Sequence, residues 1–292
     1  MKLVTFSKDG NIGAGFIDDD QIVVCAEGDG ADYAVRALIE AGSPGIQAWQ
    51  AMGAGGALRV PISDVTLLSP VPDPRRDIFC VGKNYFAHAK EFHSSGFDSS
   101  GKEAVPSAPI IFTKATTSIV GPEAVVRGSL DPTATVDYEG ELGVIIGTRA
   151  FQVAKDKAYE HVFGYVVIND VTSRELQRRH NQWVIGKGID TFCPMGPYIV
   201  TADEVGDISK LRLETEINGE IRQKASVADL IFDIPTLIET ISATMTLLPG
   251  DIIATGTPEG VGIGFNPPKY LTEGDHMTVR ITGLGELHNV IG

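Results

Sequence analysis

The amino-terminal part of the chain alternates between short apolar runs and polar turns. Runs of apolar and β-branched residues, separated by Gly, Asn and Asp, lie at residues 2–6, 13–17 and 21–25. Short runs of this kind between turn residues predict a small antiparallel β-meander. Residues 31–52 change to a helical period, which predicts one helix that ends at Gly42 and a second, short helix after Pro44.

A proline-rich segment separates this part from the rest of the chain. Residues 69–76 contain three prolines within five positions. Each proline fixes φ and removes a backbone donor, so the segment predicts a linker rather than a helix or strand. We place a domain boundary near residue 72, with a small β/α domain at residues 1–71 and a larger domain at residues 72–292.

The larger domain has mainly the pattern of strands. Candidate strands lie at residues 78–82, 109–113, 142–147, 164–169, 197–201, 211–217, 251–255 and 276–282. Candidate helices lie at residues 155–162, 172–180 and 234–244. Asn218-Gly219 predicts a tight hairpin, because both residues tolerate the positive φ of a type I′ turn. The pattern predicts an α+β fold in which a large mixed β domain carries a few helices on its flanks.

Composition and charge narrow the classes of partner. The 292 residues include 24 Lys and Arg against 38 Asp and Glu, which gives a net charge of −14. That balance argues against nucleic acid or an anionic membrane as the main partner, because both require a basic face. The chain begins without a signal peptide, and no apolar run approaches the roughly 18 residues of a membrane span. With only three, widely spaced cysteines, we expect a cytoplasmic protein with a small-molecule partner.

Two glutamates stand at the start of an apolar strand. Glu139 and Glu141 precede the run at residues 142–147, and side chains two positions apart in a strand point to one face. Close carboxylates repel each other, and a divalent cation removes that conflict. A solvent-exposed strand face is the simpler interpretation of these two residues alone.

A third carboxylate makes a cation site more plausible. Asp170 follows the apolar run at residues 164–169, where a charge is costly unless it is solvated, caps a helix or binds a ligand. Thr172 and Glu175 fit a capping box at the start of a helix, so Asp170 could serve only as part of that cap. Three carboxylates with no paired His or Cys favour Mg²⁺, Mn²⁺ or Ca²⁺ over zinc.

A candidate general base lies near the start of the larger domain. His88 and Glu91 are three residues apart on a predicted short helix, where a carboxylate orients an imidazole and raises its basicity. A surface His–Glu pair is the alternative interpretation. The polar segment at residues 93–105 is either a lid over a substrate or an ordinary surface loop.

Several further groups suit an anionic ligand. The backbone amides of the loop at residues 255–262 can cradle an anion, although the loop lacks the Gly-Lys-Ser/Thr ending of a nucleotide-binding P-loop. Lys114 and Lys187 are possible cations for a substrate carboxylate, although each alone could be a solvated surface lysine. On the predicted helix at residues 172–180, one face is shared by Arg174, Gln177 and Arg178.

Taken together, these segments resemble the motifs of the fumarylacetoacetate hydrolase family, in particular its acylpyruvase and fumarylpyruvate hydrolase branch. The matching segments run in the family's order and lie at residues 82–88, 111–114, 137–142, 169–177, 187–191, 218–220, 249–251 and 255–258. Each motif alone is weak, but their common order is specific. The resemblance covers residues 72–292 and implies a β-roll-like catalytic domain that usually forms a homodimer.

The resemblance also implies roles for particular residues. The family's metal, Mg²⁺ or a similar ion, would be bound by Glu139, Glu141 and Asp170. The catalytic residues would be His88, Glu91 and Lys187, of which the first two resemble the dyad of the acylpyruvase and oxaloacetate decarboxylase branch. Contacts with the substrate would come from Gln177, Thr257, Arg174 and Lys114.

The expected reaction is hydrolytic carbon–carbon cleavage of a 2,4-diketo acid into a 2-keto acid such as pyruvate and a carboxylic acid. His88, oriented by Glu91, would deprotonate the attacking water, and Lys187 and the metal would stabilise the enolate that leaves. Decarboxylation of oxaloacetate, or hydration or isomerisation of an unsaturated 2-keto acid, needs the same enolate and stays open. A metal-stabilised binding protein without catalysis is a third, more remote interpretation.

Overall fold

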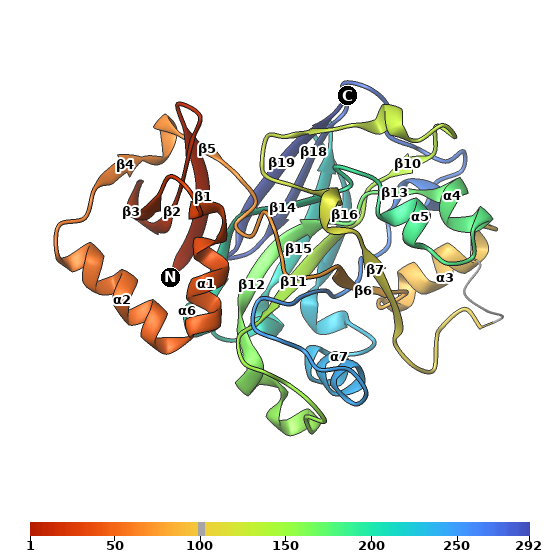
Figure 1. Ribbon diagram of the computed structural model, residues 1–292. Coiled ribbons are helices and arrows are strands. Elements are labelled where there is room, and N and C mark those ends of the chain that lie inside the picture. Colours follow the sequence, from red (N-terminus) through yellow and green to blue (C-terminus); the bar gives the residue numbers. More distant parts are fainter. Residues whose placement is uncertain (99–102) are drawn as a thin grey trace.

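The computed structural model describes residues 1–98 and 103–292 and confirms the α+β fold class (Figure 1). Part of the predicted lid segment, residues 99–102, lies outside the described residues. No helix in the described ranges is long and apolar enough to cross a membrane.

The amino-terminal part contains the predicted meander. Strands β1 (Lys2–Lys8), β2 (Asn11–Asp18) and β3 (Gln21–Glu27) pair antiparallel in sequence order. The two predicted helices are α1 (Ala34–Ala41) and α2 (Ser43–Ala54), preceded by the 3₁₀ helix η1 (Ala31–Tyr33). Gly42 separates α1 from α2 with φ of 63°, a backbone conformation that glycine adopts without strain. Shorter elements that the pattern did not predict are β4 (Arg59–Pro61), η2 (Ile62–Asp64) and β5 (Thr66–Leu67).

The meander is continuous with the sheet of the larger part. The strand order is β4-β3-β2-β1-β14-β12-β11-β17-β6-β7, and β1 joins the two parts because Lys2 and Leu3 pair with Val200 and Ile199 of β14 (Cys193–Thr201). In Figure 1 the meander and its two helices stand at the left of the molecule and the rest of the chain at the right. The division of the chain near residue 72 stays a prediction.

All eight strands predicted for the larger part are present, with ends shifted by at most four residues. They are β6 (Ile78–Gly82), β7 (Ile110–Lys114), β11 (Gly140–Ile146), β12 (Val162–Asn169), β14, β15 (Arg212–Ile217), β17 (Ile252–Ala254) and β18 (His276–Ile281). The predicted Asn218-Gly219 hairpin connects β15 to β16 (Glu220–Ser226), and both turn residues have positive φ.

The pattern missed one long strand and several short elements. The long strand is β19 (Gly285–Ile291), which pairs with β18 in a second sheet of order β16-β15-β18-β19-β9. The short strands are β8 (Ile119–Val120), β9 (Val125–Val126), β10 (Val136–Asp137) and β13 (Thr172–Ser173). The short helical elements are η3 (Thr116–Ser118), η4 (Gly128–Leu130), α5 (Val184–Lys187), α6 (Ala202–Val205), η6 (Ile208–Lys210), η7 (Val227–Asp229) and η8 (Gly262–Gly264).

Two of the helix predictions require correction. The segment predicted at residues 155–162 is a 3₁₀ helix, η5 (Lys155–His161). The helix predicted at residues 172–180 is shorter, α4 (Arg174–Arg179), and the expected capping box is wrong. Thr172 lies in β13, which pairs with β10, and its hydroxyl donates to the carbonyl of Asp170 at 2.8 Å instead of capping the helix. The remaining helices are α3 (Phe86–Ser94), which carries the His–Glu pair, and α7 (Ile234–Ser242).

The largest core lies where the long sheet packs on the second sheet. It combines buried side chains of both sheets, such as Val144 of β11, Val167 of β12, Leu213 of β15 and Val279 of β18, with apolar side chains of α7. This packing fixes β11 and β12 as buried central strands. The residues that follow or precede their ends are therefore held in place by the core.

Candidate active site

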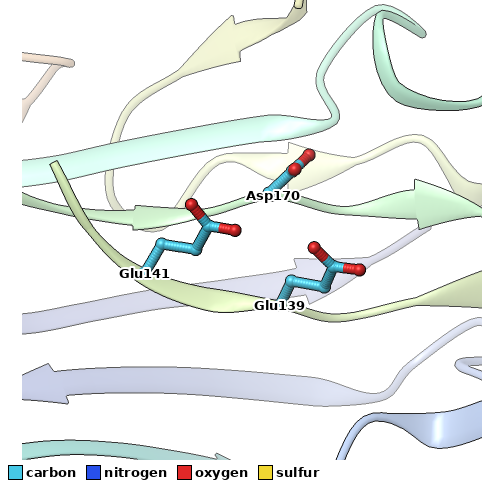
Figure 2. Close-up of side chains that lie close together, drawn as sticks. All are labelled: Glu139, Glu141 and Asp170. Atoms are coloured by element: carbon cyan, nitrogen blue, oxygen red, sulfur yellow. The ribbon is translucent and has the colours of Figure 1, made fainter. Parts of the chain in front are cut away.

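The three predicted metal ligands meet where β11 begins and β12 ends. Gly140 and Asn169 are register partners, so Glu139 just before β11 lies beside Asp170 just after β12. The amide of Asp170 donates to the carbonyl of Glu139 at 2.8 Å, which locks the two segments together. One carboxylate oxygen from each of Glu139, Glu141 and Asp170 lies within 4.8 Å of the others, and Figure 2 shows the three side chains gathered at one point.

The three carboxylates are buried and surrounded by cations. Their residues are 5%, 1% and 0% exposed in chain order, which excludes the simpler interpretation of a solvent-exposed strand face. Lys187 Nζ lies 2.8 Å from both Glu139 Oε2 and Asp170 Oδ2. Arg174 Nη1 lies 2.6 Å from Glu139 Oε1, and Lys114 Nζ lies 2.6 Å from Asp170 Oδ1. Buried charges need partners of this kind, because desolvation is otherwise too costly.

The two glutamates have opposite electrostatic environments. Burial raises the pKa of Glu139, but Lys187 and Arg174 outweigh it and lower that pKa to about 2. Burial raises the pKa of Glu141 well above its usual value, and the charges of Asp170 and Glu139 raise it further. Glu141 Oε2 accepts the Gly256 amide at 2.8 Å, a weaker compensation than an ion pair. Glu141 is therefore the carboxylate whose charge the protein compensates least.

This donor set fits a divalent cation. The buried cluster contains three cations, Lys114, Lys187 and Arg174, against four carboxylates, Asp137, Glu139, Glu141 and Asp170. With all these groups ionised the cluster has one excess negative charge, and a divalent cation beside Glu141 would change its net charge to +1, which suits an anionic small molecule. Three carboxylates are ligands that Mg²⁺ and Mn²⁺ accept, and they leave coordination positions for a small molecule.

Lys187 reaches the carboxylates because α5 packs tightly against α4. A Cβ atom on Gly186 would lie 2.4 Å from the backbone nitrogen of Gln177, so a larger residue would push the two helices apart. The carbonyl of Lys187 accepts a hydrogen bond from Lys114 Nζ, which also donates to the Val171 carbonyl at 3.0 Å. Lys114 thus connects the Val171 and Lys187 backbone to the Asp170 carboxylate.

A small cavity beside the triad collects most of the predicted site residues. The predicted residues that line it are His88, Glu139, Arg174, Gln177, Lys187 and Thr257. Phe92, Phe112 and Trp183 contribute apolar surface. The cavity volume is about 10 Å³, room for roughly one water molecule. Lys114 does not line this cavity but contacts Asp170, so its geometry suits a positioning role. The predicted contact between Lys114 and the substrate stays a prediction.

The predicted His–Glu pair forms on α3. His88 Nδ1 and Glu91 Oε2 are 3.2 Å apart, and the His88 side chain is buried against the cavity. The amide of Gly260 donates to Glu91 Oε1 at 3.0 Å, which fixes the carboxylate from the opposite side. The loop at residues 255–262 therefore supports the pair through one of its amides.

Two residues without a predicted role complete the support of the site. Asp137 accepts the amides of Gly262 at 2.6 Å and Ile263 at 3.0 Å and the Nε of Arg174 at 2.8 Å. Gln223 of β16 accepts the Gly140 amide at 3.0 Å and donates to the Thr257 hydroxyl at 2.8 Å. Asp137 stands two positions before Glu139, so the same alternation that relates Glu139 and Glu141 could have indicated it.

One predicted neighbour of the cavity takes a different role. Arg178 does not line it, because its side chain is exposed and pairs with Glu175 at 2.8 Å. Lys83 does line it, and its Nζ lies 2.8 Å from Asp98 Oδ2 and 2.9 Å from the Glu103 carbonyl. The described ends of the segment at residues 93–105 are thus anchored beside the cavity. Whether this segment acts as a lid stays a prediction.

The fold carries a buried carboxylate triad, a candidate site for a divalent metal, beside a His–Glu pair, and comparison with known proteins identifies a family whose enzymes act on keto acids. The family model described as "Fumarylacetoacetate (FAA) hydrolase C-terminal" matches residues 77–292. The chain belongs to this family, as its motifs indicated. Its relatives include enzymes named as hydrolases, isomerases and a tautomerase.

Three relatives show how far the similarity extends. The oxaloacetate tautomerase YisK of Bacillus subtilis is 47% identical over 238 residues, which cover 81% of this chain and 76% of the relative. A fumarylacetoacetate hydrolase from Exiguobacterium antarcticum is 39% identical with a TM-score of 0.82, covering 100% of this chain and 99% of that one. A maleylpyruvate hydrolase from Sphingobium sp., solved with manganese(II) and pyruvate, is 31% identical with a TM-score of 0.78, covering 100% and 98%.

Proposed function

We propose that the chain is a divalent-metal-dependent enzyme that acts on a 2-keto dicarboxylic acid through its enol, with keto–enol tautomerisation of oxaloacetate as the first reaction to test. The observation that carries the proposal is one cavity, lined by His88, Lys187 and Glu139, next to the buried carboxylate triad. The 47% identity to an oxaloacetate tautomerase favours this reaction over the hydrolysis expected from the sequence alone.

In a proton transfer, the residues at the cavity would have separate roles. A Mg²⁺ or Mn²⁺ ion held by Glu139, Glu141 and Asp170 would supply Lewis-acid stabilisation of negative charge on a keto oxygen. His88 would move a proton between carbon 3 of the substrate and solvent, and Glu91 would hold the imidazole in the orientation that this transfer needs.

The remaining polar groups suit the two ends of a dicarboxylate. The ammonium of Lys187 would place positive charge beside the oxygen that becomes an enolate. Arg174 Nη2 is buried and has no hydrogen-bond partner among the described residues, so it has a free donor beside Gln177 and Thr257, which also line the cavity. We propose that these three side chains bind the substrate's carboxylates, since a guanidinium recognises carboxylates well. Because the cavity as it stands has room for roughly one water molecule, its walls would move apart to admit the substrate.

Hydrolysis of a 2,4-diketo acid is the second candidate. Here His88 would take a proton from water, and the water oxygen would attack the distal carbonyl before the carbon–carbon bond breaks. The 31% identity to a maleylpyruvate hydrolase and the His88–Glu91 pair of this chain favour hydrolysis. Decarboxylation of oxaloacetate is the third reaction that this cavity allows.

One set of assays separates these reactions. Purified protein with Mg²⁺ is given the enol form of oxaloacetate, and the loss of the enol's ultraviolet absorbance is followed together with release of pyruvate. Acetylpyruvate is tested in parallel for pyruvate and acetate. Tautomerisation predicts rapid loss of enol without pyruvate, whereas pyruvate from acetylpyruvate or from oxaloacetate would indicate hydrolysis or decarboxylation. No acceleration of any of these reactions would refute the proposal.

The role of His88 is tested on whichever reaction proceeds. His88→Ala should lower the turnover number at least about a hundredfold, the usual contribution of a general acid–base group, and should leave metal binding intact. His180→Ala is the matched control, because His180 is exposed at the end of α4. Equal turnover of the His88→Ala variant and this control would exclude His88 as the proton carrier.

A further inference from the structure

A second and much larger cavity lies further along β12 from the triad. Its walls come from β12, η5, the α6–η6 connection and the segment from η7 to the start of α7, and its volume is about 410 Å³. Tyr165 of β12 lines it, five residues before Asp170, which places it roughly 16 Å away along the strand. A volume of this size is typical of small-molecule sites.

The walls of this cavity are fixed by local hydrogen bonds. Asp207 accepts the Ser209 amide at 3.1 Å and holds η6, and Asp233 accepts the Thr236 amide at 2.9 Å at the start of α7. A complete capping box formed by Ser226 and Asp229 holds η7. A preformed cavity of this kind needs little ordering when a ligand binds.

The hydroxyl of Tyr165, a residue of the wall, has no partner in the described part of the chain. Tyr165 as a residue is only 2% exposed, and its hydroxyl makes no hydrogen bond within the described ranges of the chain; because the hydroxyl is not among the buried atoms without a partner, it is reached by solvent. A hydroxyl without a protein partner can exchange its hydrogen bond to water for one to a ligand. A hydroxyl that lines a cavity in this state is available to a ligand.

The polar groups of the lining have one sign of charge. Asp207 and Asp233 line the cavity, whereas no Lys, Arg or His occurs among the described lining residues. Lys155 and Lys210 pair with these carboxylates at 3.0 and 3.7 Å but do not line the cavity. Burial raises the pKa of the half-exposed Tyr159 hydroxyl, and the charges of Asp233 and Asp207 raise it further.

We propose that this cavity is a second binding site, for a small molecule with an apolar body and one ammonium group. The apolar side chains Ile208, Val227, Leu230 and Ile234 would surround the body, and the ring of Tyr159 would face the cation. Asp207 and Asp233 would pair with the ammonium, and the Tyr165 hydroxyl would hydrogen-bond to the ligand. Because the lining offers an anion no cation among the described residues, a keto-acid substrate would not compete for this site.

The test uses benzylammonium as the probe in a ligand-detected NMR titration of the full chain. A probe of this size should bind saturably with a Kd of about 1 mM. Benzoate, of the same shape and opposite charge, should not bind. An excess of oxalate with Mg²⁺, which would occupy the triad cavity, should not displace benzylammonium. Absence of saturable binding, equal binding of benzoate, or displacement by oxalate would overturn the proposal.

Variants locate the binding. Ala228→Trp places a large side chain at the cavity wall and should abolish binding. The double variant Asp207→Asn with Asp233→Asn keeps both caps, because Asn caps helices as well as Asp, and should weaken binding about tenfold. Tyr165→Phe removes the hydroxyl that would hydrogen-bond to the ligand and should weaken binding, whereas Tyr198→Phe, on β14 outside the cavity, should not. Unchanged binding in both the Ala228→Trp variant and the double variant would refute this location.

Discussion

The cavity beside the triad is much smaller than the one lined by Tyr165, but it borders more charged groups. The triad cavity holds about 10 Å³ and borders a buried cluster of four carboxylates and three cations, whereas the Tyr165 cavity holds about 410 Å³ and has two carboxylates in its lining. Long side chains such as Lys187 and Arg174 fill the space between the charges of the first cavity. The charged groups from which we propose the chemistry lie beside the smaller cavity, so the volume of a cavity alone would direct attention to the other.

The largest expected effect tests whether the triad is a catalytic centre. Asp170→Asn removes a ligand charge but keeps the side chain's shape, and we expect the turnover number to fall about a thousandfold with loss of Mg²⁺ binding. Asp18→Asn is the control, because Asp18 is exposed at the end of β2. Steady-state rates and a metal titration measure both effects. Full turnover without bound metal would remove the distinction between the two cavities.

The next prediction concerns the buried cations that pair with the carboxylates beside the small cavity. Lys114→Met leaves Asp170 with one cation fewer and leaves the Val171 and Lys187 carbonyls without their donor. Breaking a buried ion pair from one side should lower the free energy of unfolding by about 3 kcal/mol. Denaturant titration measures this change.

The matched control for Lys114 is an exposed lysine. Lys210→Met removes a pair 3.7 Å long whose lysine side chain is 81% exposed, so its effect should stay below about 0.5 kcal/mol. Similar losses in the two variants would show that the buried cluster is not held together by its charges.

A third prediction uses the metal itself. Binding of Mg²⁺ to the folded chain alone should stabilise it by about 2.7 kcal/mol at a hundred times the Kd, and EDTA should reverse the gain. Glu141→Gln removes the least compensated carboxylate and should abolish most of this gain. Glu27→Gln, at the exposed end of β3, should retain it. A gain that is equal in both variants would place the metal elsewhere.

The sequence predicted the triad because the three carboxylates stand at the ends of apolar strands. Glu139 and Glu141 share one strand face, and Asp170 ends the neighbouring strand, so local patterning and adjacency were sufficient to bring them together. The buried polar network behind them could not be predicted in this way. Gln223 reaches Gly140 from the other sheet, and no local pattern encodes a contact across 83 positions.

The missed strand and the mistaken cap have local causes. In β19 the buried position 289 is Asn, whose amide donates to the carbonyls of Gly121 and Ala124, so a polar residue interrupts the apolar alternation. Threonine often caps the start of a helix, but the pairing of Thr172 with β10 outweighs that preference. In both places a tertiary contact decides the structure, and such contacts leave no periodic signal.

The smallest expected effect contrasts two buried tyrosines. Tyr138 donates its hydroxyl to the Gly260 carbonyl at 2.8 Å, so Tyr138→Phe should lower the free energy of unfolding by about 1 kcal/mol. Tyr165→Phe keeps the ring in the core and removes a hydroxyl with no partner among the described residues, so its effect should lie within about 0.5 kcal/mol. Denaturant titration of both variants measures the difference. A loss in Tyr165→Phe as large as that in Tyr138→Phe would mean that the Tyr165 hydroxyl is already satisfied, and that the larger cavity offers a ligand no free hydroxyl.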